Sequence, residues 1–349
     1  MKLNKIAKTL LATAALAGSL VTSTAATAGT YEYSRYTGWE LWAYINDSGI
    51  LDKWNAKYNE DVKIEYVGDY IQSLDNFKNG NTLGVTATNI DAMGVFASAG
   101  VHAEALINGS YSNGNDGVII RNGDSCKDLA GLTVLMAEYS VSDYATVKCL
   151  ESAGLTRDDI QVESAGDGDI ANLYANDPNV MSVAIWNPPL QVIKTNNTDA
   201  VEVYSSKQIP FEILDTMYVN PNAPETEKKV LVGAWFEALG NIQKRGSKRT
   251  AAIKYMAKNS GASSAQFKQQ MGTTKFLNAK EQIDFASSAK IKSVTADVRD
   301  VVIAHFLPKA SMASNINVQF ADGSVVGDAS KVRITYPTKY AEMALNGKL

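Results

Sequence analysis

The chain has few of the residues that most enzymes use for catalysis. Its 349 residues include only two His and two Cys. Two His are too few for a zinc site built on several imidazoles, and they leave few general bases for a Ser or Cys nucleophile. The chain also lacks a G-x-x-x-x-G-K-[ST] phosphate-binding loop and a G-x-S-x-G nucleophile elbow. These absences argue against an enzyme, and we expect no metal and no other cofactor.

The first 28 residues have the pattern of a cleaved signal peptide. Lys2, Lys5 and Lys8 precede a short apolar run, and Ala26-Thr27-Ala28 precedes Gly29 as a signal-peptidase site would. The apolar run is shorter than the roughly 20 residues that a membrane span requires. No Cys follows it, which argues against a lipid anchor. The sequence therefore predicts a protein that is exported and begins near Gly29.

The chain has no excess of basic residues. Three of its 33 Lys and Arg lie within residues 1–28, where no acid occurs, so the remainder carries a net charge of about −7. Nucleic acids and anionic membranes both require a basic surface, so neither is expected as a partner.

The two Cys are candidates for a disulfide. In an oxidising compartment a lone pair of Cys often forms a bridge. Cys126 precedes a predicted strand at residues 132–138, and Cys149 lies late in the helix predicted after it. Both would then lie near the start of the strand. A bridge and two buried free thiols both remain open from the sequence.

After residue 30 short β-branched runs alternate with helical patterns, which predicts βαβ units and a mainly parallel sheet. The chain is long enough for two domains. The expected strands are 31–36, 62–67, 84–86, 103–108, 117–121, 132–138, 160–163, 181–185 and 201–204, and the expected helices are 40–58, 71–78, 90–99, 143–153 and 170–175. Beyond Pro224 amphipathic spacing predicts helices at 230–244, 247–257, 264–270 and 293–306. The polar segment 315–349 has no predicted element.

Two short motifs are weak. Residues 166–171 match G-x-G-x-x-A, but Asp167 and Asp169 would repel a pyrophosphate, so a tight turn is the better interpretation. His102-Ala-Glu104 matches part of a zinc-deaminase signature, but its P-C-x-x-C partner is missing.

The ends of the predicted strands share one kind of side chain. Ligands of open α/β sheets bind outside the carboxyl ends of strands. Acids, amides and indoles recur there, whereas Lys and Arg are nearly absent. The candidate ligand-binding residues are Trp39, Glu40, Trp42, Asn89, Asp91, Asp116, Glu138, Ser140, Ser142, Trp186, Asn187 and Asp215.

Each candidate also has an ordinary structural explanation. Acids in a first helical turn complement the helix dipole, as at Glu40 and Asp91. Asn89, Ser140 and Ser142 are good helix N-caps. The Trp side chains could pack beneath a helix. As a set, however, the candidates gather at the edge where a crevice should form, which favours a binding site.

The predicted site is suited to a cation. A sulfonate, nitrate or phosphate would need Arg, Lys or free helix amides as donors. Guanidinium is planar, presents only N–H donors and stacks on indole rings. The sequence therefore predicts an anionic slot lined by flat rings between two domains.

Several motifs resemble one family of transport proteins. The chain is similar to periplasmic substrate-binding proteins of ABC importers, of the nitrate/sulfonate/taurine type. Within this type it most resembles the branch encoded beside urea-carboxylase genes, whose carboxylases are associated with guanidine. It departs from that branch at Leu41, where Pro is usual. The motifs are Y-T-G-W-E-L-W (36–42), D-S-G-I-L-D-K-W (47–54), G-V-T-A-T-N-I-D-A (84–92), S-N-G-N-D-G (112–117), D-L-A-G-L-T-V (128–134), L-E-S-A-G-L (150–155), A-I-W-N-P-P (184–189) and N-G-K-L (346–349).

The resemblance implies a two-lobe α/β fold with two hinge crossings, each lobe a mainly parallel sheet flanked by helices. Lobe 1 would comprise residues 29–117 and 216–349, and lobe 2 residues 118–215. It also implies a periplasmic monomer that delivers a small molecule to an inner-membrane permease. We expect guanidinium as the ligand. Urea, a sulfonate or nitrate-type anion, and a secreted enzyme acting on an amidine or urea remain as alternatives.

Overall fold

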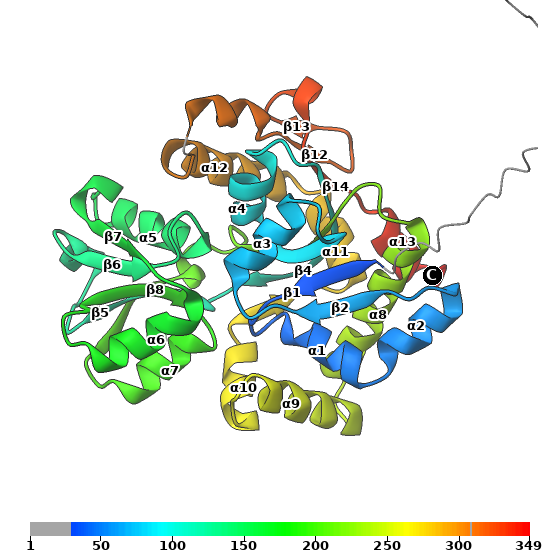
Figure 1. The fold of residues 1–349 in the computed structure, drawn as a ribbon, viewed down its shortest axis with the longest axis horizontal. Helices are drawn as coiled ribbons and strands as arrows, with labels where there is room; N and C mark the ends of the chain where they lie inside the picture. Colours follow the sequence, from blue (N-terminus) through cyan, green and yellow to red (C-terminus); the bar gives the residue numbers. More distant parts are fainter. Residues whose placement is uncertain (1–28, 308) are drawn as a thin grey trace, which may run out of the picture.

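The computed structural model describes residues 29–307 and 309–349, and within these ranges the chain forms two α/β lobes that lie side by side (Figure 1). The two-lobe α/β architecture that we expected is therefore confirmed. The predicted signal peptide, residues 1–28, lies outside the described residues. No helix in the described ranges is both long and apolar enough to cross a membrane.

The larger lobe is built on a sheet with the strand order β13-β12-β14-β4-β10-β3-β1-β2, to which β11 adds by pairing with β4. Its strands are β1 (Thr30–Tyr33), β2 (Lys63–Tyr66), β3 (Gly84–Thr88), β4 (Ala103–Ser112), β10 (Leu214–Val219), β11 (Thr274–Phe276), β12 (Val318–Phe320), β13 (Val325–Val326) and β14 (Ile334–Tyr336). Its helices are α1 (Glu40–Asp47), α2 (Ile50–Tyr58), α3 (Tyr70–Lys78), α4 (Asn89–Asp91), α8 (Glu225–Gln243), α9 (Ser247–Asn259), α10 (Ser264–Met271), α11 (Ala279–Ala286), α12 (Ala289–His305) and α13 (Lys339–Leu345).

The smaller lobe, at the left of Figure 1, has a sheet with the order β7-β6-β8-β5-β9. Its elements are β5 (Asp116–Arg121), β6 (Thr133–Met136), α5 (Val141–Ser152), β7 (Gln161–Ser164), α6 (Asp167–Asn176), β8 (Ser182–Trp186), α7 (Pro189–Asn196) and β9 (Ala200–Ser205). The chain passes between the sheets twice, from β4 to β5 and from β9 to β10. Because of these returns β5 and β10 run antiparallel to both of their neighbours, while β1, β2 and β3 pair in parallel.

The strand register brings acids to the junction of the lobes. Asp215 in β10 lies opposite Thr88 at the end of β3 and opposite Ser110 in β4. Asp116, the first residue of β5, lies opposite Trp186, the last residue of β8. These positions belong to strand ends, as the sequence analysis expected.

The helix that we predicted over residues 40–58 is two helices. Ser48 ends α1, and Gly49 adopts a left-handed conformation with φ 71° before α2 begins. Gly accepts this conformation without a Cβ clash, so it allows the turn between the two helices.

The structure also settles two points on which the sequence made no single prediction: the C-terminal segment and the pairing of the two Cys. The segment 315–349, for which we predicted no element, adds β12, β13 and β14 to the edge of the larger sheet and ends in α13. Cys126 and Cys149 form a disulfide with a Cα–Cα distance of 5.5 Å, which resolves the two alternatives in favour of the bridge.

Gly109 in β4 allows helix α8 to pack closely against the sheet of the larger lobe. The Trp235 ring of α8 lies on β4 where a Cβ at Gly109 would come within 2.6 Å of ring atom Cζ2. Trp235 also packs against Trp42, with ring centroids 4.9 Å apart. Because Gly109 has no Cβ, the Trp235 indole can lie in the core of the larger lobe directly against β4.

Candidate functional site: a buried acidic cluster between the lobes

Three carboxyl groups lie buried where the two sheets meet. Asp91 comes from the turn after β3, Asp116 from the start of β5 and Asp215 from the start of β10, and none is more than 2% exposed. We call these three residues the acidic cluster. Burying an ionised carboxylate is costly unless it is paired or hydrogen-bonded, so the partners of each group indicate its role.

Asp215 is held by one oxygen. Tyr36, just after β1, donates its hydroxyl to Asp215 Oδ2 at 2.7 Å, and Ser110 Oγ donates to the same oxygen at 2.8 Å. Asp215 Oδ1 is buried and has no hydrogen-bond partner among the described residues.

Asp91 repeats this arrangement. Tyr70, the first residue of α3, donates its hydroxyl to Asp91 Oδ2 at 2.6 Å, and Thr88 Oγ1 donates to the same oxygen at 2.7 Å. Asp91 Oδ1 is likewise buried and without a partner within residues 29–307 and 309–349. Two acceptor oxygens are therefore left for a guest.

Asp116 is also bound only by neutral groups. It accepts a hydrogen bond from Ser112, whose hydroxyl lies 2.6 Å from that of Ser206. Ser206 in turn accepts the backbone N–H of Gly114 at 2.7 Å. The hydroxyls therefore connect this acid to both crossings between the lobes.

The three acids of the cluster all have raised pKa values. Burial is the main cause in each case; it raises the pKa of Asp91 to about 6, that of Asp116 to about 7 and that of Asp215 well above the usual value. The charge of Asp91 adds to the rise at Asp116, and the charge of Asp116 adds to the rise at Asp215. No Lys, Arg or His is among the groups that shift these three pKa values, so the surroundings of the cluster favour a bound proton or cation.

A row of aromatic rings lies beside the acids. The Trp39 ring packs between Tyr36 and Tyr70, at centroid distances of 4.9 and 5.5 Å. Tyr70 also contacts Trp186 of the smaller lobe at 5.6 Å, and Trp186 Nε1 donates to the carbonyl of Arg35 at 3.2 Å. Trp39 Nε1 is buried without a partner in the described parts of the chain. The rings thus cross from one lobe to the other.

The predicted amides lie at the crossings and the lobe contact. Asn89 donates to the carbonyl of Glu212 at 2.9 Å and accepts the backbone N–H of Leu214 at 2.8 Å, so it holds the segment that leads into β10. Asn187 caps the start of α7 by accepting the N–H of Gln191 at 3.0 Å. Its Nδ2 donates to Thr273 Oγ1 of the larger lobe at 3.2 Å.

Ser140 and Ser142 lie at the N-terminus of α5, which contacts α4 across the lobe boundary. Ser140 Oγ accepts the Ser142 backbone N–H at 3.2 Å and thereby caps the helix. Ser142 Oγ is buried with no partner among the described residues, so it is available to a guest.

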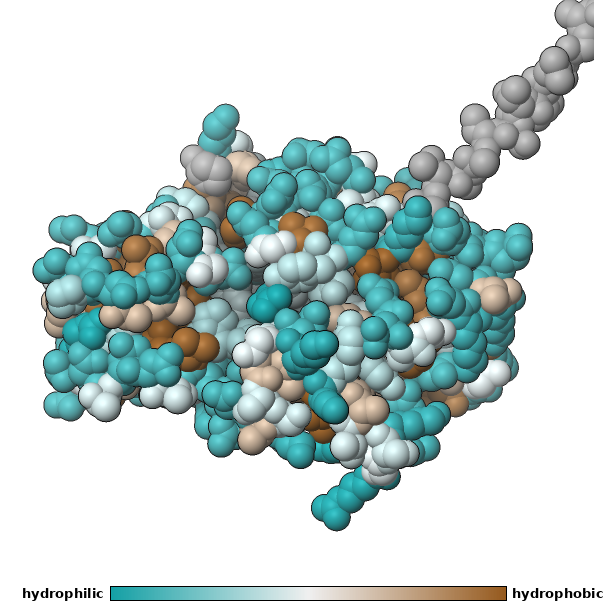
Figure 2. Space-filling model, turned by 60° about the horizontal axis from the view of Figure 1, so that its bottom comes forward, coloured by the Kyte–Doolittle hydropathy of each residue, from teal (hydrophilic) through white to brown (hydrophobic). Residues whose placement is uncertain are grey.

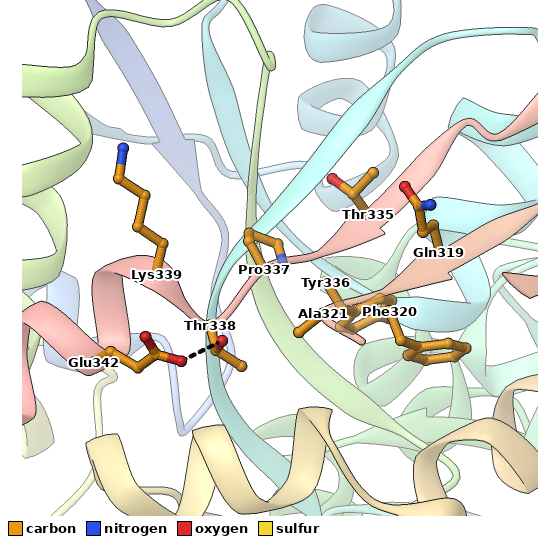
Figure 3. Close-up of a pocket in the computed structure, with 9 residues that line it drawn as sticks. All are labelled: Gln319, Phe320, Ala321, Thr335, Tyr336, Pro337, Thr338, Lys339 and Glu342. Atoms are coloured by element: carbon orange, nitrogen blue, oxygen red, sulfur yellow. Dashed lines mark hydrogen bonds between the residues drawn. The ribbon is translucent and has the colours of Figure 1, made fainter. Parts of the chain in front are cut away.

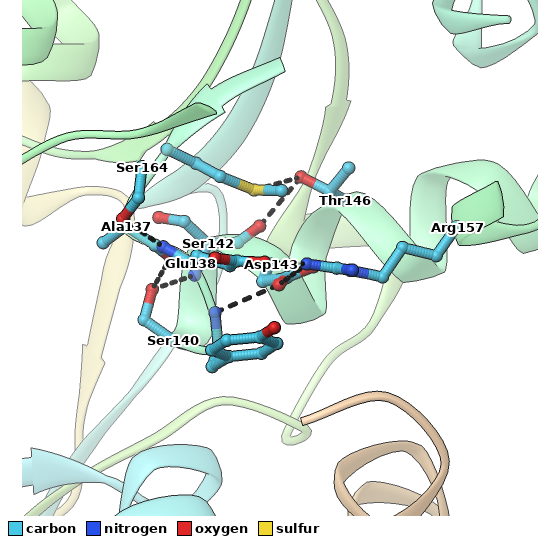
Figure 4. A network of polar contacts seen from close by, with 10 residues as sticks. Ala137, Glu138, Ser140, Ser142, Asp143, Thr146, Arg157 and Ser164 are labelled. Atoms are coloured by element: carbon cyan, nitrogen blue, oxygen red, sulfur yellow. Dashed lines mark hydrogen bonds and ion pairs between the residues drawn. The ribbon is translucent and has the colours of Figure 1, made fainter. Parts of the chain in front are cut away.

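Glu138 lies instead in an ion-pair network at the same helix end (Figure 4). Arg157 contacts Glu138 Oε1 at 2.9 Å and Asp143 Oδ2 at 3.0 Å, and its guanidinium lies 5.4 Å from the centroid of the Tyr139 ring. The sequence analysis counted almost no basic residue near the strand ends and overlooked this Arg. Glu138 is thus an acceptor that is already paired.

Two further predicted residues pack elsewhere in the larger lobe. Trp42 lies against Trp235 in the core and is 1% exposed. Glu40 accepts a hydrogen bond from Asn259 of α9, and its pKa is raised mainly by burial. The Glu40 backbone N–H donates to the carbonyl of Tyr36 at 3.1 Å, but among the described residues neither side chain hydrogen-bonds to the three acids.

The residues that the sequence analysis missed are the hydroxyl-bearing residues Tyr36, Tyr70, Thr88, Ser110, Ser112 and Ser206. Tyr36 directly precedes the motif that contains Trp39, and Tyr70 directly precedes a predicted helix, so both lay beside predicted positions. The sequence carried no signal that their hydroxyls would point at acids on other strands.

Away from this junction, an open pocket of about 310 Å³ lies between β12, β14 and α13 (Figure 3). Its polar contact is the hydrogen bond from Thr338 Oγ1 to Glu342 Oε1 at 2.7 Å. None of the predicted site residues lines it. Its lining residues are Gln319, Phe320, Ala321, Thr335, Tyr336, Pro337, Thr338, Lys339 and Glu342.

The arrangement of the molecule matches solved periplasmic binding proteins. The alkanesulfonate-binding protein SsuA from Xanthomonas axonopodis pv. citri, bound to MOPS, superposes with a TM-score of 0.66 at 16% identity, covering 82% of this chain and 96% of that one. The periplasmic aliphatic sulphonate-binding protein SsuA from Escherichia coli gives 0.61 at 17% identity, with 81% and 94% covered. The periplasmic nitrate-binding protein NrtA from Synechocystis PCC 6803 gives 0.65 at 13% identity, with 92% and 89% covered.

No protein-family model and no curated protein matches the sequence. The likeness thus comes from structure at low identity, and it concerns the fold. The chain has the two-lobe fold of these periplasmic binding proteins.

Proposed function

We propose that the chain is the periplasmic solute-binding protein of an ABC importer and that it captures guanidinium between its lobes. The observation that carries this proposal is the acidic cluster. Its three carboxyl groups are buried with only neutral hydrogen-bond partners, two of them keep one oxygen without a partner among the described residues, and the Tyr36 and Tyr70 rings that hold these two acids pack against Trp39. A small planar cation supplies the missing charge and the missing N–H donors.

The size of the effect is adequate for specific binding. Each hydrogen bond between a guanidinium N–H and a carboxylate contributes about 1.5–3 kcal/mol. A cation on an aromatic face adds roughly 0.5–2 kcal/mol. Two such bonds and one ring contact amount to about 3.5–8 kcal/mol, which corresponds to dissociation constants from the millimolar to the micromolar range.

The chain contains a model for this chemistry in its own Arg157. That guanidinium lies between the carboxylates of Glu138 and Asp143 and near the Tyr139 ring. Arg, Asp and Tyr side chains therefore already form, at the N-terminus of α5, the kind of contacts that we propose for the free ligand.

An anion is the second candidate, because two of the similar structures are named for sulfonate and one for nitrate. An anion in the cluster would face three acids, and the donors beside them include the Trp39 N–H, the Ser142 hydroxyl and the backbone N–H of Val141, which faces Asp91. An anion site would need charged or clustered donors instead. Neutral urea would also need donors for its carbonyl oxygen, so it fits less well than guanidinium.

In this proposal the lobes divide as the two sheets do, close to the boundaries at 117/118 and 215/216 expected from the sequence, with Asp116 in β5 of the smaller lobe and Asp215 in β10 of the larger lobe. The lobes move about the two crossings. Ligand bound between them favours the closed state, because both lobes then contribute contacts. The partners would be the ligand and an inner-membrane permease, and the protein would act as a monomer. The role is binding and not catalysis.

The direct test is isothermal titration calorimetry of the protein with guanidinium chloride, urea, nitrate and an alkanesulfonate. We expect saturable binding of guanidinium alone, and Asp215→Asn should abolish it. The matched control is Asp61→Asn, which alters a carboxyl group whose side chain is 77% exposed. Saturable binding of nitrate or sulfonate without guanidinium binding would overturn the cation assignment.

A further inference from the structure

Tyr36 and Tyr70 contact the acidic cluster in the same way. Each hydroxyl donates to Oδ2 of a buried Asp, and in each case a second hydroxyl, from Ser110 or Thr88, donates to the same oxygen. In each case Oδ1 is left without a partner among the described residues. The same local arrangement, in which two hydroxyls donate to one carboxylate oxygen, is thus formed twice, by residues from different elements.

This arrangement fixes a carboxylate in one orientation. A carboxylate with one oxygen held by two donors cannot rotate without breaking both bonds, so its second oxygen keeps a fixed direction. The same donors stabilise the ionised form, and each of them opposes the rise of pKa that burial causes at Asp215 and Asp91. The acids are thereby prepared to accept N–H groups before a guest arrives.

The rings of Tyr36 and Tyr70 also fix the position of the Trp39 ring. Trp39 lies between them, at 4.9 Å from Tyr36 and 5.5 Å from Tyr70. A movement of either Tyr would therefore displace an acid and the indole together.

We propose that Tyr36 and Tyr70 are paired positioning residues that select for guests with N–H donors, because each holds one oxygen of an acid and leaves the other to the ligand. This inference rests on the proposed cation site and extends it. The selected class is a planar cation that offers a separate N–H group to Asp91 and to Asp215. A quaternary ammonium ion of similar size offers no N–H and is rejected.

None of the groups that face Asp215 and Asp91 is basic. Asp215 faces Tyr36, Ser110 and the neighbouring Asp116. Asp91 faces Tyr70, Thr88 and the backbone N–H of Val141 at the start of α5. Because none of these groups is basic, a change in a hydroxyl donor acts on the acid itself.

The test is calorimetric titration with guanidinium chloride of Tyr36→Phe and Tyr70→Phe, each repeated across a pH series. Loss of one hydrogen bond to a charged group should weaken binding about tenfold to hundredfold. It should also move the pH at which binding is half-maximal upward, because the acid then loses its proton at a higher pH. Tetramethylammonium should fail to bind every variant.

The matched control is Tyr31→Phe. Tyr31 is also fully buried in the larger lobe, and its hydroxyl donates to Glu227 Oε2 at 2.7 Å, in another part of the sheet. It should lower stability to a similar extent while leaving affinity and pH dependence unchanged.

Ser110→Ala provides a smaller change if a Tyr variant does not fold, since the Ser110 hydroxyl donates to the same oxygen of Asp215. It should shift the pH dependence in the same direction. Wild-type affinity and pH dependence in Tyr70→Phe and Ser110→Ala would overturn the inference while leaving guanidinium binding intact. Absence of guanidinium binding to the wild-type protein at any pH would instead reject the proposed function.

Discussion

At the scale of single residues, Trp186 is one of the side chains that join the lobes directly. Its indole N–H donates to the Arg35 carbonyl of the larger lobe at 3.2 Å, and its ring contacts Tyr70. Both contacts exist only while the lobes are together. Trp186 therefore stabilises the closed state whether or not it touches the ligand.

Replacing Trp186 by Phe should remove the interlobe hydrogen bond and keep an aromatic ring near Tyr70. One neutral hydrogen bond contributes about 0.5–1.5 kcal/mol, so the ligand should dissociate about two- to tenfold faster. Stopped-flow measurement of dissociation would show it. Trp54→Phe is the matched control, because Trp54 Nε1 donates to Glu237 Oε2 at 2.8 Å within one lobe; equal dissociation rates in both variants would contradict the prediction.

At the scale of elements, helix α8 carries two Gly residues with opposite surroundings. A Cβ at Gly233 would lie 2.4 Å from atoms of the Trp54 ring of α2, whereas a Cβ at Gly240 would meet nothing within 4 Å. Gly233 thus allows α2 and α8 to approach closely, and Gly240 has no such role.

Gly233→Ala should therefore lower the free energy of unfolding by about 1–3 kcal/mol, because the Trp54 ring must move. Gly240→Ala should raise it by up to about 1 kcal/mol, because Ala favours a helix more than Gly does. Urea unfolding of the two variants measures both effects. A shift of both midpoints in the same direction would refute this account of the helix contact.

The disulfide joins the turn before β6 to the end of α5. Its Cys residues are separated by 23 positions, and closing a loop of that length stabilises the folded state by about 3 kcal/mol in the chain-entropy description. The Cys126→Ser/Cys149→Ser variant should lose about that much stability in denaturant unfolding. Unchanged stability, with the bridge verified in the wild type by thiol titration, would contradict the prediction.

The sequence predicted the central elements of both lobes but missed the edge of the larger sheet. Strands such as β12 and β13 are only three and two residues long, so they are too short for a two-residue alternation to be seen. The helix from 40 to 58 kept its apolar spacing across the break, so periodicity alone could not reveal the turn at Gly49.

The acids of the site were predictable for a definite reason. Asp91, Asp116 and Asp215 lie at strand ends, and the topology of open sheets places strand ends together. The same rule led us to predict Trp42 as a site residue, but its ring lies in the core against Trp235. Side chains in the first turn of a helix point in different directions, so position at a strand end alone does not place a side chain in the site. The Tyr donors were not predictable, since a Tyr beside a strand is as often a core residue as a hydrogen-bond donor.

At the scale of the whole molecule, the face of the two lobes drawn in Figure 2 is mainly hydrophilic. Figure 2 shows hydrophilic residues over most of one face, with hydrophobic residues in small separate groups. Three acids with raised pKa values lie buried at the lobe junction, and Asp167 at the start of α6 has a pKa raised to about 6 as well, so the acidic cluster is one part of the molecule through which pH acts on stability.

The cluster makes the stability of the protein without bound cation sensitive to pH. Burial raises the pKa of Asp91 to about 6 and that of Asp116 to about 7, both from 3.8. An acid whose pKa is raised on folding binds its proton more tightly in the folded state. Its contribution to stability is complete below the unfolded pKa and is lost as pH rises through the folded value. Stability without ligand should therefore decline between about pH 4 and about pH 7.

Guanidinium reverses this effect because it favours the ionised acids. The increase in melting temperature caused by millimolar guanidinium chloride should thus be small at about pH 5 and larger at about pH 8. Differential scanning calorimetry at matched ionic strength measures it, with sodium chloride in place of the ligand as the control. In Asp116→Asn one of the three titrating groups is absent, so the ligand-free decline should be shallower. A ligand-induced shift that is the same at both pH values would show that the acids are ionised before the cation binds.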